Sequence, residues 1–423
     1  MKDIWANRYE KIEEKIGRDT VEVLVGFNAN IDVTYAVEDL ELDFRSSEPE
    51  DMDRVDSIED LKSVLRYHVE KEENGEVDLG RLDLDLDGGD ESVGGQAGIM
   101  ANFLSGFHNS VTFYTPLLSQ ELADLMRKDI LYPVYDGGFV LKNVRDSANT
   151  DRTKKNRIFE YSNDRGRMIL SDKIRGFNPY FREGVADHLE EMDEHLDRVL
   201  LSGFHDVKQD VEGSLSNAGD QMSRIETPIH FEFVDTDSER IEAIADHVIP
   251  EADSLGLDEH EMDELEEVLD LDITGEEDRV SLGEAYRAAK KLMDRYGLSR
   301  VHLHTYRFHV VVTDQDYPVG PEKIRDAMMW GEVQAIRMGD LGRIPELEDT
   351  RKSLDMDDKH LKRLDDLEDF GKFFGLENFA EEGFAEVEDY QVSAIPTIIH
   401  EDPERVVGMG DVISSGTFVA ELK

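Results

Sequence analysis

Apolar residues follow two different spacings along this chain, and the two spacings alternate through its C-terminal half. Runs dominated by apolar residues predict buried strands at residues 21–25, 199–203, 228–234, 301–304 and 309–312. Apolar positions three or four residues apart predict helices over residues 185–199, 285–296 and 321–337. Strands that alternate with helices are typical of an α/β fold with a largely parallel sheet. No Pro/Gly/Ser-rich linker interrupts the pattern, so a second domain would be inserted into the first.

The segment at residues 406–416 (VVGMGDVISSG) joins an apolar run to the start of a predicted helix through two glycines and an acid. Glycine lets a ligand approach the backbone closely, and a helix N-terminus offers free N–H groups that suit an anion. Asp411 could accept a proton while these amides hold the charge that develops, as phosphoryl transfer requires. The alternative is an ordinary tight turn in which Asp411 caps the helix.

Composition limits the function classes. A chain of 423 residues can form two domains, or one large domain with a lid. No apolar run approaches the roughly 20 residues that span a membrane, and the N-terminus carries no signal-peptide pattern. Together with the absence of cysteine, this predicts a cytoplasmic protein without membrane attachment.

The net charge of −51 excludes a basic nucleic-acid footprint for the chain as a whole. Repulsion on this scale opposes compaction in dilute salt, whereas at 1 M salt the Debye length falls to about 3 Å. We therefore expect a protein from a halophilic, high-salt cytoplasm. A binding role for the acidic surface is the alternative.

Three other motifs carry groups that could bind a sugar or a metal ion. Residues 26–32 (GFNANID) follow the first predicted strand and offer Asn and Asp side chains for hydroxyl groups, or form an Asx-rich turn. Residues 94–102 (GGQAGIMAN) begin a predicted helix with paired glycines, which either let a ligand approach the backbone or let the helix pack tightly. The segment is not a Walker P-loop, because it lacks the Gly-Lys-Ser/Thr ending. Residues 230–232 (HFE) and 258–261 (DEHE) offer carboxylates for Mg²⁺, or belong to acidic surface.

One segment reverses the charge of the chain. Residues 152–182 hold nine basic residues and three acids, a net charge of +6. Such a segment attracts phosphate, so it predicts a site for a phosphorylated substrate or for nucleotide phosphates. The alternative is a basic face that pairs with acidic neighbours.

Taken in order, these motifs resemble the ADP-dependent sugar kinases of the ribokinase-like superfamily, a family that includes ADP-dependent phosphofructokinase and glucokinase. Further matching segments are residues 201–205 (LSGFH), 253–259 (DSLGLDE) and 302–305 (HLHT), so the resemblance spans about 390 residues. It implies a three-layer α/β/α nucleotide-binding domain, formed by residues 1–33, 92–112 and 183–423. A smaller β-rich lid would comprise residues 34–91 and 113–182.

The resemblance also implies residue roles. Asp411 matches the catalytic base, and the anion hole would lie at Gly408, Met409 and Gly410. Glu232 and Glu259 match acids that act through Mg²⁺. The substrate-binding positions would be Asn30, Asp32, Gly94, Gly95, Gln96 and Arg175. The nucleotide-binding positions would be His304, Pro396, Thr397 and Val407.

The resemblance, and not composition or spacing, implies ADP as the phosphoryl donor. We expect fructose 6-phosphate as the acceptor because residues 152–182 would suit a dianion. The alternatives are an ADP-dependent glucokinase, another ribokinase-like sugar or nucleoside kinase, and a sugar- or nucleotide-binding relative that lacks catalysis.

Three segments depart from the family pattern: Ser92-Val93 replaces a basic residue before the paired glycines, Asp258 replaces Asn, and the lid motif reads Arg175-Gly-Phe-Asn-Pro. The sequence does not determine the oligomeric state.

Overall fold

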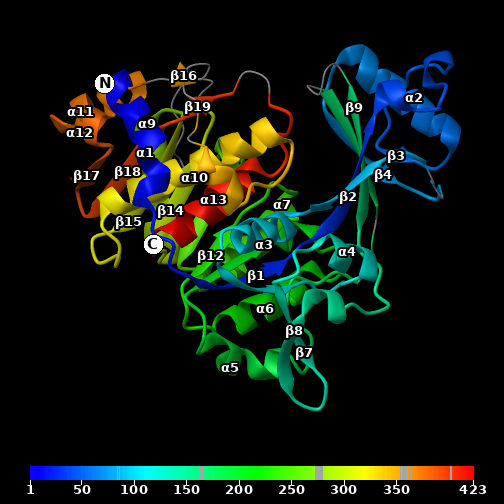
Figure 1. Ribbon diagram of the computed structural model, residues 1–423, viewed down its shortest axis with the longest axis horizontal. Helices are drawn as coiled ribbons and strands as arrows, with labels where there is room; N and C mark the ends of the chain where they lie inside the picture. The colour runs from blue at the N-terminus through cyan, green and yellow to red at the C-terminus, as the bar shows by residue number, and fades with distance from the viewer. Residues whose placement is uncertain are drawn as a thin grey trace.

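Most strands belong to two sheets (Figure 1). The first strand lies in the larger sheet, the next strands form the smaller sheet, and later segments add strands to the larger sheet again. The computed structural model describes residues 1–82, 84, 86–161, 166–172, 174, 176–271, 280–352, 354, 360–361, 364–400 and 403–423. Within these residues, a large sheet has eleven strands and a smaller sheet has six. A two-stranded ribbon pairs β16 (His360–Leu361) with β19 (Ile398–Ile399).

The large sheet contains a continuous parallel core from β7 to β14, flanked by antiparallel strands. In order across the sheet, its strands are β17 (Phe384–Val387), β18 (Tyr390–Pro396), β15 (Phe308–Asp314), β14 (Arg300–His304), β13 (Ser254–Leu257), β12 (Ile229–Glu232), β11 (Arg198–Ser202), β1 (Glu22–Phe27), β6 (Ser110–Tyr114), β7 (Leu131–Tyr135) and β8 (Phe139–Asn143). Val23, Leu24 and Val25 of β1 are fully buried. Such runs are expected when helices cover both faces of a parallel sheet.

Helices cover the two faces of the large sheet and complete a three-layer arrangement. One layer comprises α1 (Lys2–Lys15), α3 (Gln96–Gly106), α10 (Pro321–Leu341) and α13 (Met409–Ala420). The opposite layer comprises α6 (Val211–Met222), α7 (Ser238–His247), α8 (Glu259–Leu269), α9 (Leu282–Tyr296) and α11 (Leu364–Phe374). None of the helices in the described ranges is long and apolar enough to cross a bilayer.

The smaller sheet and α2 (Ile58–Lys71) project from one end of the large domain, at the upper right of Figure 1. In order, the strands of this lid sheet are β3 (Arg54–Val55), β4 (Gly75–Leu79), β10 (Gly166–Asp172), β9 (Lys155–Tyr161), β2 (Asn30–Ala36) and β5 (Asp90–Gly94). Leu61, Val64 and Leu65 of α2 are fully buried, so this helix gives the lid sheet a covered face. β2 begins three residues after β1 ends, and β5 leads directly into α3. The lid is thus joined to the large domain beside the first strand.

Two sequence predictions about the fold were wrong. The single helix expected over residues 185–199 is a short turn at Ala186–His188 followed by α5 (Leu189–Asp193), after which the chain enters β11. The Asp193 carboxylate accepts hydrogen bonds from the backbone amides of Glu226 (2.7 Å) and Thr227 (3.2 Å), which fixes the turn where the helix stops. The apolar spacing persists because both parts face the core.

The second error concerns the lid boundary. β7 and β8 lie within the residues assigned to the lid, yet β7 pairs with β6 and extends the edge of the large sheet. α4 (Gln120–Leu125) precedes them. Strand pairing at this edge depends on contacts between segments distant along the chain, which local apolar spacing does not encode. Residues 30–33 and 92–94, which the prediction gives to the large domain, also differ, because they pair in β2 and β5 of the lid sheet. The other limits of the two domains stay a prediction.

Candidate active site

The predicted catalytic segment forms the start of α13, a helix that is buried along almost its whole length. Its N-cap is Gly408, with φ of +86°. A Cβ atom at this position would lie 2.7 Å from Cδ1 of Ile99 in α3, so both backbone angle and space call for glycine. Farther along the helix, Gly416 packs against Gly331 of α10, where a Cβ at 416 would lie 3.4 Å from the Gly331 Cα. Small residues thus let α13 lie close to α10, with its N-terminus at the carboxyl ends of the parallel strands.

The first turn of α13 presents unpaired backbone donors toward this edge. The N–H groups of Gly410 and Asp411 have no carbonyl partner within the helix, as is general for the first turn. The amide of Met409 instead donates to the Val406 carbonyl at 3.3 Å. Within the predicted anion hole, Gly410 is therefore better placed than Met409 to donate to an anion, and Asp411 adds a second amide.

Asp411 carries an unusual pKa for a carboxylate. Burial, followed by repulsion from the Glu232 carboxylate, raises its pKa to about 7, although the nearby cations His304 and Arg405 act in the opposite direction. A carboxyl group whose pKa lies near neutrality is suited to accept and release a proton. Such a strong shift in a cleft is typical of a functional site.

Glu232 ends β12 and is held by a dense set of hydrogen bonds. Its Oε1 accepts from His304 Nε2 at 2.8 Å, and its Oε2 lies 3.0 Å from His230 Nε2. The hydroxyl of Ser414, one turn into α13, also donates to Oε2. Burial opposes ionisation, but the hydrogen bonds from the two histidines lower the pKa of Glu232 to about 2. Burial alone would lower the pKa of His304, yet its bond to Glu232 raises it to about 9.

A cavity of about 490 Å³ lies on one side of Asp411. It reaches from the first turns of α8 and α13 to β19, and Gly410 and Met409 form part of its wall. Of the predicted nucleotide-binding residues, His304 and Thr397 also line it. Pro396 and Val407 lie beside the wall, where their carbonyls accept hydrogen bonds from Tyr9 (2.6 Å) and Arg405 (3.1 Å).

Sequence reasoning missed several residues in the wall of this nucleotide-sized cavity. Tyr306 follows β14 and is 81% exposed, an unusual state for a large aromatic side chain. His309 of β15 and Glu332 of α10 are buried and paired at 2.9 Å between Nε2 and Oε2, and Oε1 of Glu332 accepts from the amide of Ile398 at 2.7 Å. This last pairing fixes the cavity wall at β19. The spacing of apolar residues does not indicate these contacts, because His309, Glu332 and Ile398 are far apart in the sequence.

A second cavity, of about 280 Å³, lies between the lid and the strand ends of the large sheet. Asn28 and Asn30 contribute to its wall from the β1–β2 junction, and Lys154 and Asp172 contribute from the lid. Asn30 Nδ2 donates to Oδ1 of Asp32 at 2.6 Å, so the two predicted sugar-binding side chains are oriented together. Burial raises the pKa of Asp32.

The paired glycines pack directly against these two side chains. A Cβ on Gly94 would lie 2.2 Å from a carboxylate oxygen of Asp32, and one on Gly95, where φ is +74°, would lie 2.7 Å from Oδ1 of Asn30. Gln96 accepts a hydrogen bond from Asn28. The structure therefore brings together all the predicted substrate-binding residues except Arg175, which lies outside the described residues.

The basic segment behaves in two ways. Several of its members pair with acids: Arg152 with Asp172 at 2.6 Å, Lys155 with Glu91 at 3.0 Å, and Arg182 with Asp151 at 2.9 Å. Lys154 also pairs with an acid, Asp206, and it lies in the wall of the second cavity, as does Lys208, which lies outside the segment. Their ammonium groups are 3.4 and 3.5 Å from Oδ1 of Asp206. Arg165, Lys173 and Arg175 are outside the described residues.

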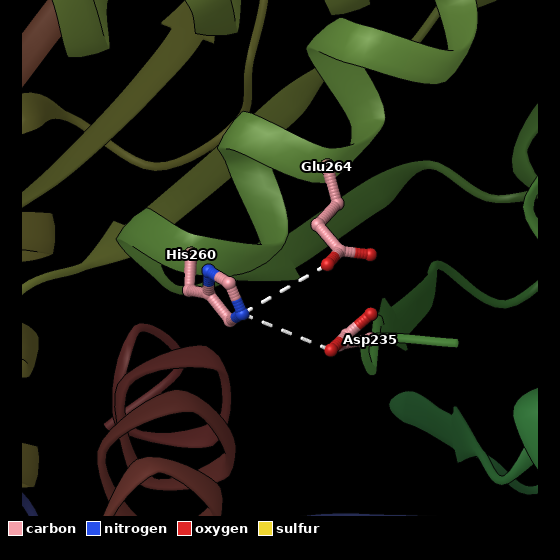
Figure 2. A group of neighbouring side chains, drawn as sticks. All are labelled: Asp235, His260 and Glu264. Carbon is pink, nitrogen blue, oxygen red and sulfur yellow. Dashed lines mark ion pairs between the residues drawn. The ribbon is translucent and has the colours of Figure 1, made fainter. Parts of the chain in front are cut away.

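The side chains of Asp235, His260 and Glu264 lie together (Figure 2). Asp235 lines the second cavity and His260 lines the first. His260 Nε2 lies 3.8 Å from Oδ2 of Asp235 and 3.8 Å from Oε1 of Glu264. A hydrogen bond with Asp235 is the main cause that raises the pKa of Glu264 to about 7. The three side chains hold the N-terminus of α8 beside the loop that follows β12.

The two predicted magnesium ligands differ in how well they fit a hard cation. Glu259, the first residue of α8, lines the cavity beside α13 and offers carboxylate oxygens, the ligands that Mg²⁺ prefers. Both oxygens of Glu232, which ends β12, are engaged by His304, His230 and Ser414. Direct coordination by Glu232 would require loss of one of these bonds. The local acids thus suit an ion held mainly through water and ligand phosphates.

The model of the ADP-specific phosphofructokinase/glucokinase conserved region matches residues 21–420. The chain belongs to this family. An ADP-dependent glucose/glucosamine kinase of Pyrococcus furiosus is 27% identical over 460 residues, which cover 99% of this chain and 98% of that family member. The ADP-specific phosphofructokinase of the same organism is 26% identical over 365 residues, which cover 78% of each chain.

Solved structures of the family agree with this fold over nearly the whole chain. A reconstructed last common ancestor of ADP-dependent phosphofructokinases from Methanosarcinales superposes with a TM-score of 0.81 at 26% identity, covering 99% of this chain and 97% of that one. An ADP-dependent kinase in complex with fructose 6-phosphate and ADPβS gives a TM-score of 0.80 at 25% identity, with the same coverage. The predicted α/β class and the family resemblance are confirmed.

Proposed function

We propose that this family member is an ADP-dependent sugar kinase that transfers the terminal phosphoryl group of ADP to fructose 6-phosphate, giving fructose 1,6-bisphosphate and AMP. The main support is Asp411, whose pKa is raised to about 7 and which lies in the first turn of α13, where Met409 and Gly410 line the larger cavity. The printed names of the relatives, and the complex with fructose 6-phosphate and ADPβS, support the donor and the acceptor class.

In this proposal, the larger cavity holds ADP. Tyr306 supplies an exposed aromatic face for the adenine base, and His304 supplies a positive charge near the phosphates. The terminal phosphoryl group lies at the first turn of α13, where the amides of Gly410 and Asp411 donate to its oxygens. When bound, Mg²⁺ neutralises phosphate charge, and Glu259 is the side chain best placed to hold its water shell.

The smaller cavity holds the sugar. The amide of Asn30 and the carboxylate of Asp32 hydrogen-bond to its hydroxyl groups, and Gly94 and Gly95 leave the space that this requires. Asp411 accepts the proton of the attacking hydroxyl as its oxygen approaches phosphorus. Closure of the lid over the sugar excludes water, which would otherwise receive the phosphoryl group.

The choice of fructose 6-phosphate depends on Lys154 and Lys208. Both ammonium groups line the cavity, and neither forms a contact shorter than 3.4 Å with Asp206 in the described structure. Each could turn toward a phosphate dianion. Burial opposes the charge on Asp206, but His205 and the two lysines lower its pKa to about 2, so this carboxylate remains charged and holds the lysines in the cavity wall.

Glucose or glucosamine is the second candidate acceptor. Glu76 and Asp78 of β4 also line the cavity, and carboxylates there favour a neutral or cationic sugar over a dianion. The glucose/glucosamine kinase of Pyrococcus furiosus aligns with this chain over almost its full length. Lysines in this cavity favour fructose 6-phosphate, whereas its carboxylates favour glucose or glucosamine. A direct assay with each acceptor distinguishes the two candidates.

The test is AMP formation from ADP, in molar KCl with Mg²⁺, using fructose 6-phosphate, glucose and glucosamine as acceptors and ATP as a comparison donor. We expect turnover with ADP and fructose 6-phosphate. The variants Lys154→Met and Lys208→Met should each raise KM for fructose 6-phosphate about tenfold or more, since a hydrogen bond to a charged group contributes about 1.5–3 kcal/mol. KM for ADP should not change.

Lys62→Met is the matched control, because Lys62 pairs with Glu59 on the surface of the lid helix and lies outside both cavities. It should behave as the wild type. Turnover of glucose without turnover of fructose 6-phosphate would reverse the substrate assignment. Preference for ATP over ADP would contradict the proposed donor.

A further inference from the structure

Arg405 is a cation beside the reaction site that no sequence motif identified. It lies in the loop between β19 and α13, and its side chain is half-buried. Its Nε donates to the Val407 carbonyl at 3.1 Å, which pins the guanidinium group next to the N-terminus of α13. The terminal nitrogens form no ion pair with any residue in the described ranges. Two strong donors thus remain for a ligand.

The carboxylates around Arg405 show which parts of the molecule lie close to its side chain. Asp411 of α13, Asp32 of β2 and Glu160 of β9 are the acids close enough to stabilise its charge. These three come from the catalytic helix, the sugar-binding strand and the lid. Arg405 therefore lies close to the carboxylate of Asp411 and to the strand that carries Asp32, next to where the proposed transfer would take place.

Arg405 keeps terminal donors available for an anion, although acids surround it. Burial is the largest influence on Arg405 and lowers its pKa, because a guanidinium group in this position has lost part of its hydration. His304, the other cation near Asp411, is already bonded to Glu232 at 2.8 Å. Arg405 is thus the cation with donors to spare where the terminal phosphate of ADP would arrive next to the carboxylate of Asp411.

We propose that Arg405 is a catalytic residue that binds the phosphoryl group in transit, opposite the amides of Gly410 and Asp411. The planar fork of its guanidinium group matches two phosphoryl oxygens. It would offset the charge that spreads over those oxygens in the transition state and the repulsion between them and Asp411. This assignment rests on the proposed function, since it requires a nucleotide whose terminal phosphoryl group lies at α13.

The decisive measurement compares ADP with AMP, because only ADP carries the phosphoryl group that Arg405 would contact. Calorimetric titration of Arg405→Ala should show ADP affinity reduced about tenfold to a hundredfold, with AMP affinity unchanged. In turnover, kcat should fall about a hundredfold to a thousandfold, the range for loss of one transition-state donor. Arg405→Lys keeps the charge without the fork, so it should recover part of both losses.

Arg343→Ala is the control for loss of an arginine in itself, because Arg343 pairs with Asp349 at 2.8 Å on the surface. It should bind ADP and turn over as the wild type does. Thermal unfolding of each variant shows whether the fold is retained. If Arg405→Ala does not fold, the ADP and AMP titrations of Arg405→Lys decide the question, since the lost fork should weaken ADP alone.

A purely structural role for Arg405 predicts something different. If it serves only to neutralise Asp411, then Asp411→Asn removes the need for it, and adding Arg405→Ala to that variant should leave ADP affinity unchanged. Contact with the phosphoryl group predicts that the tenfold or greater loss persists in the double variant. Equal weakening of ADP and AMP, or no weakening of either, would overturn the assignment.

These outcomes are distinct from failure of the proposed function. If the wild type binds ADP more tightly than AMP but phosphorylates no sugar, the kinase proposal fails while the titrations still test Arg405. If the wild type binds neither nucleotide, both proposals are wrong.

Discussion

Asp411 is the residue whose acid–base behaviour is changed most clearly by burial and by neighbouring charges. An aspartate in water loses its proton near its ordinary pKa of 3.8, whereas here burial and the charge of Glu232 raise the pKa to about 7. The side chain can therefore accept the proton of a sugar hydroxyl and release it near neutral pH. His304 and Arg405 prevent the shift from going further.

Asp411→Asn removes the proton acceptor and keeps the shape of the side chain. We expect kcat to fall by about 10²- to 10⁴-fold, the range for loss of a general base, while KM for ADP changes little. Steady-state AMP formation measures both parameters. Turnover within a few-fold of the wild type would exclude Asp411 as the base.

The pH dependence follows from the sign of the same shift. Asp411 must be charged to accept a proton, so kcat/KM should rise with pH through about 7 and level off above it. Between the ordinary pKa of 3.8 and about 7, the folded state retains a proton that the unfolded state has lost, so this group opposes folding increasingly as pH rises.

Asp411→Asn removes this effect on folding. The difference in unfolding temperature between this variant and the wild type should therefore increase in favour of the variant from pH 5 to pH 8. Fluorescence-monitored melting across that interval is the measurement. A constant difference would show that the pKa of Asp411 is not raised in the folded state.

At the scale of the element, α13 shows how a helix end is placed precisely. Its glycines and serines remove the bulk that would keep it away from α10 and α3, and Gly408 turns the chain sharply into the first helical turn. The donors of that turn then lie at the strand ends, beside the cavity that Met409 and Gly410 line. In the proposed function, the position of this helix, more than any one side chain, provides the anion site.

Gly408→Ala tests this placement. It combines two costs: a positive φ, about 1–2 kcal/mol for a residue with a Cβ, and a contact of 2.7 Å with Ile99. Gly297→Ala is the matched control, since Gly297 also has positive φ, of +75°, at the end of α9 but has open space around its Cβ position. Both variants should lower the unfolding temperature, and Gly408→Ala should lower it more.

Only Gly408→Ala should also lower kcat, because only this change displaces the first turn of α13. Kinetic assay of the two variants side by side provides the comparison. Equal kcat for both would indicate that the geometry of the N-cap does not matter for transfer.

At the scale of the whole molecule, charge dominates. The 98 acids exceed the 47 basic residues by 51, and most acids have no basic partner available to them. Self-repulsion of this size opposes the compact state unless salt screens it. We propose that the protein is adapted to a high-salt interior, and its stability should depend on salt accordingly.

The unfolding temperature should rise as KCl increases from about 0.1 to 2 M, where the Debye length falls from about 10 Å to below 3 Å. The slope of that rise should shrink toward pH 5, as acids become neutral near the sequence pI of about 4.4. Calorimetry at a series of KCl concentrations measures both effects. An unfolding temperature that is constant or falls with salt at pH 8 would contradict the charge argument.

The sequence by itself determined the elements and the motifs, because both are local. The alternation of strands and helices and the turn at residues 408–411 depend on backbone preferences and on apolar spacing. The ordered set of motifs was also sufficient to indicate the family.

Only the tertiary structure decided which of these groups act together. The raised pKa of Asp411 depends on Glu232, nearly 180 residues away, and on burial that no local pattern specifies. Arg405 carries no motif, and β7 and β8 joined the large sheet against expectation. The physical reason is the same in each case. Parallel strands bring residues from distant segments to one edge of a sheet, and electrostatic interactions depend on distance in space rather than along the chain.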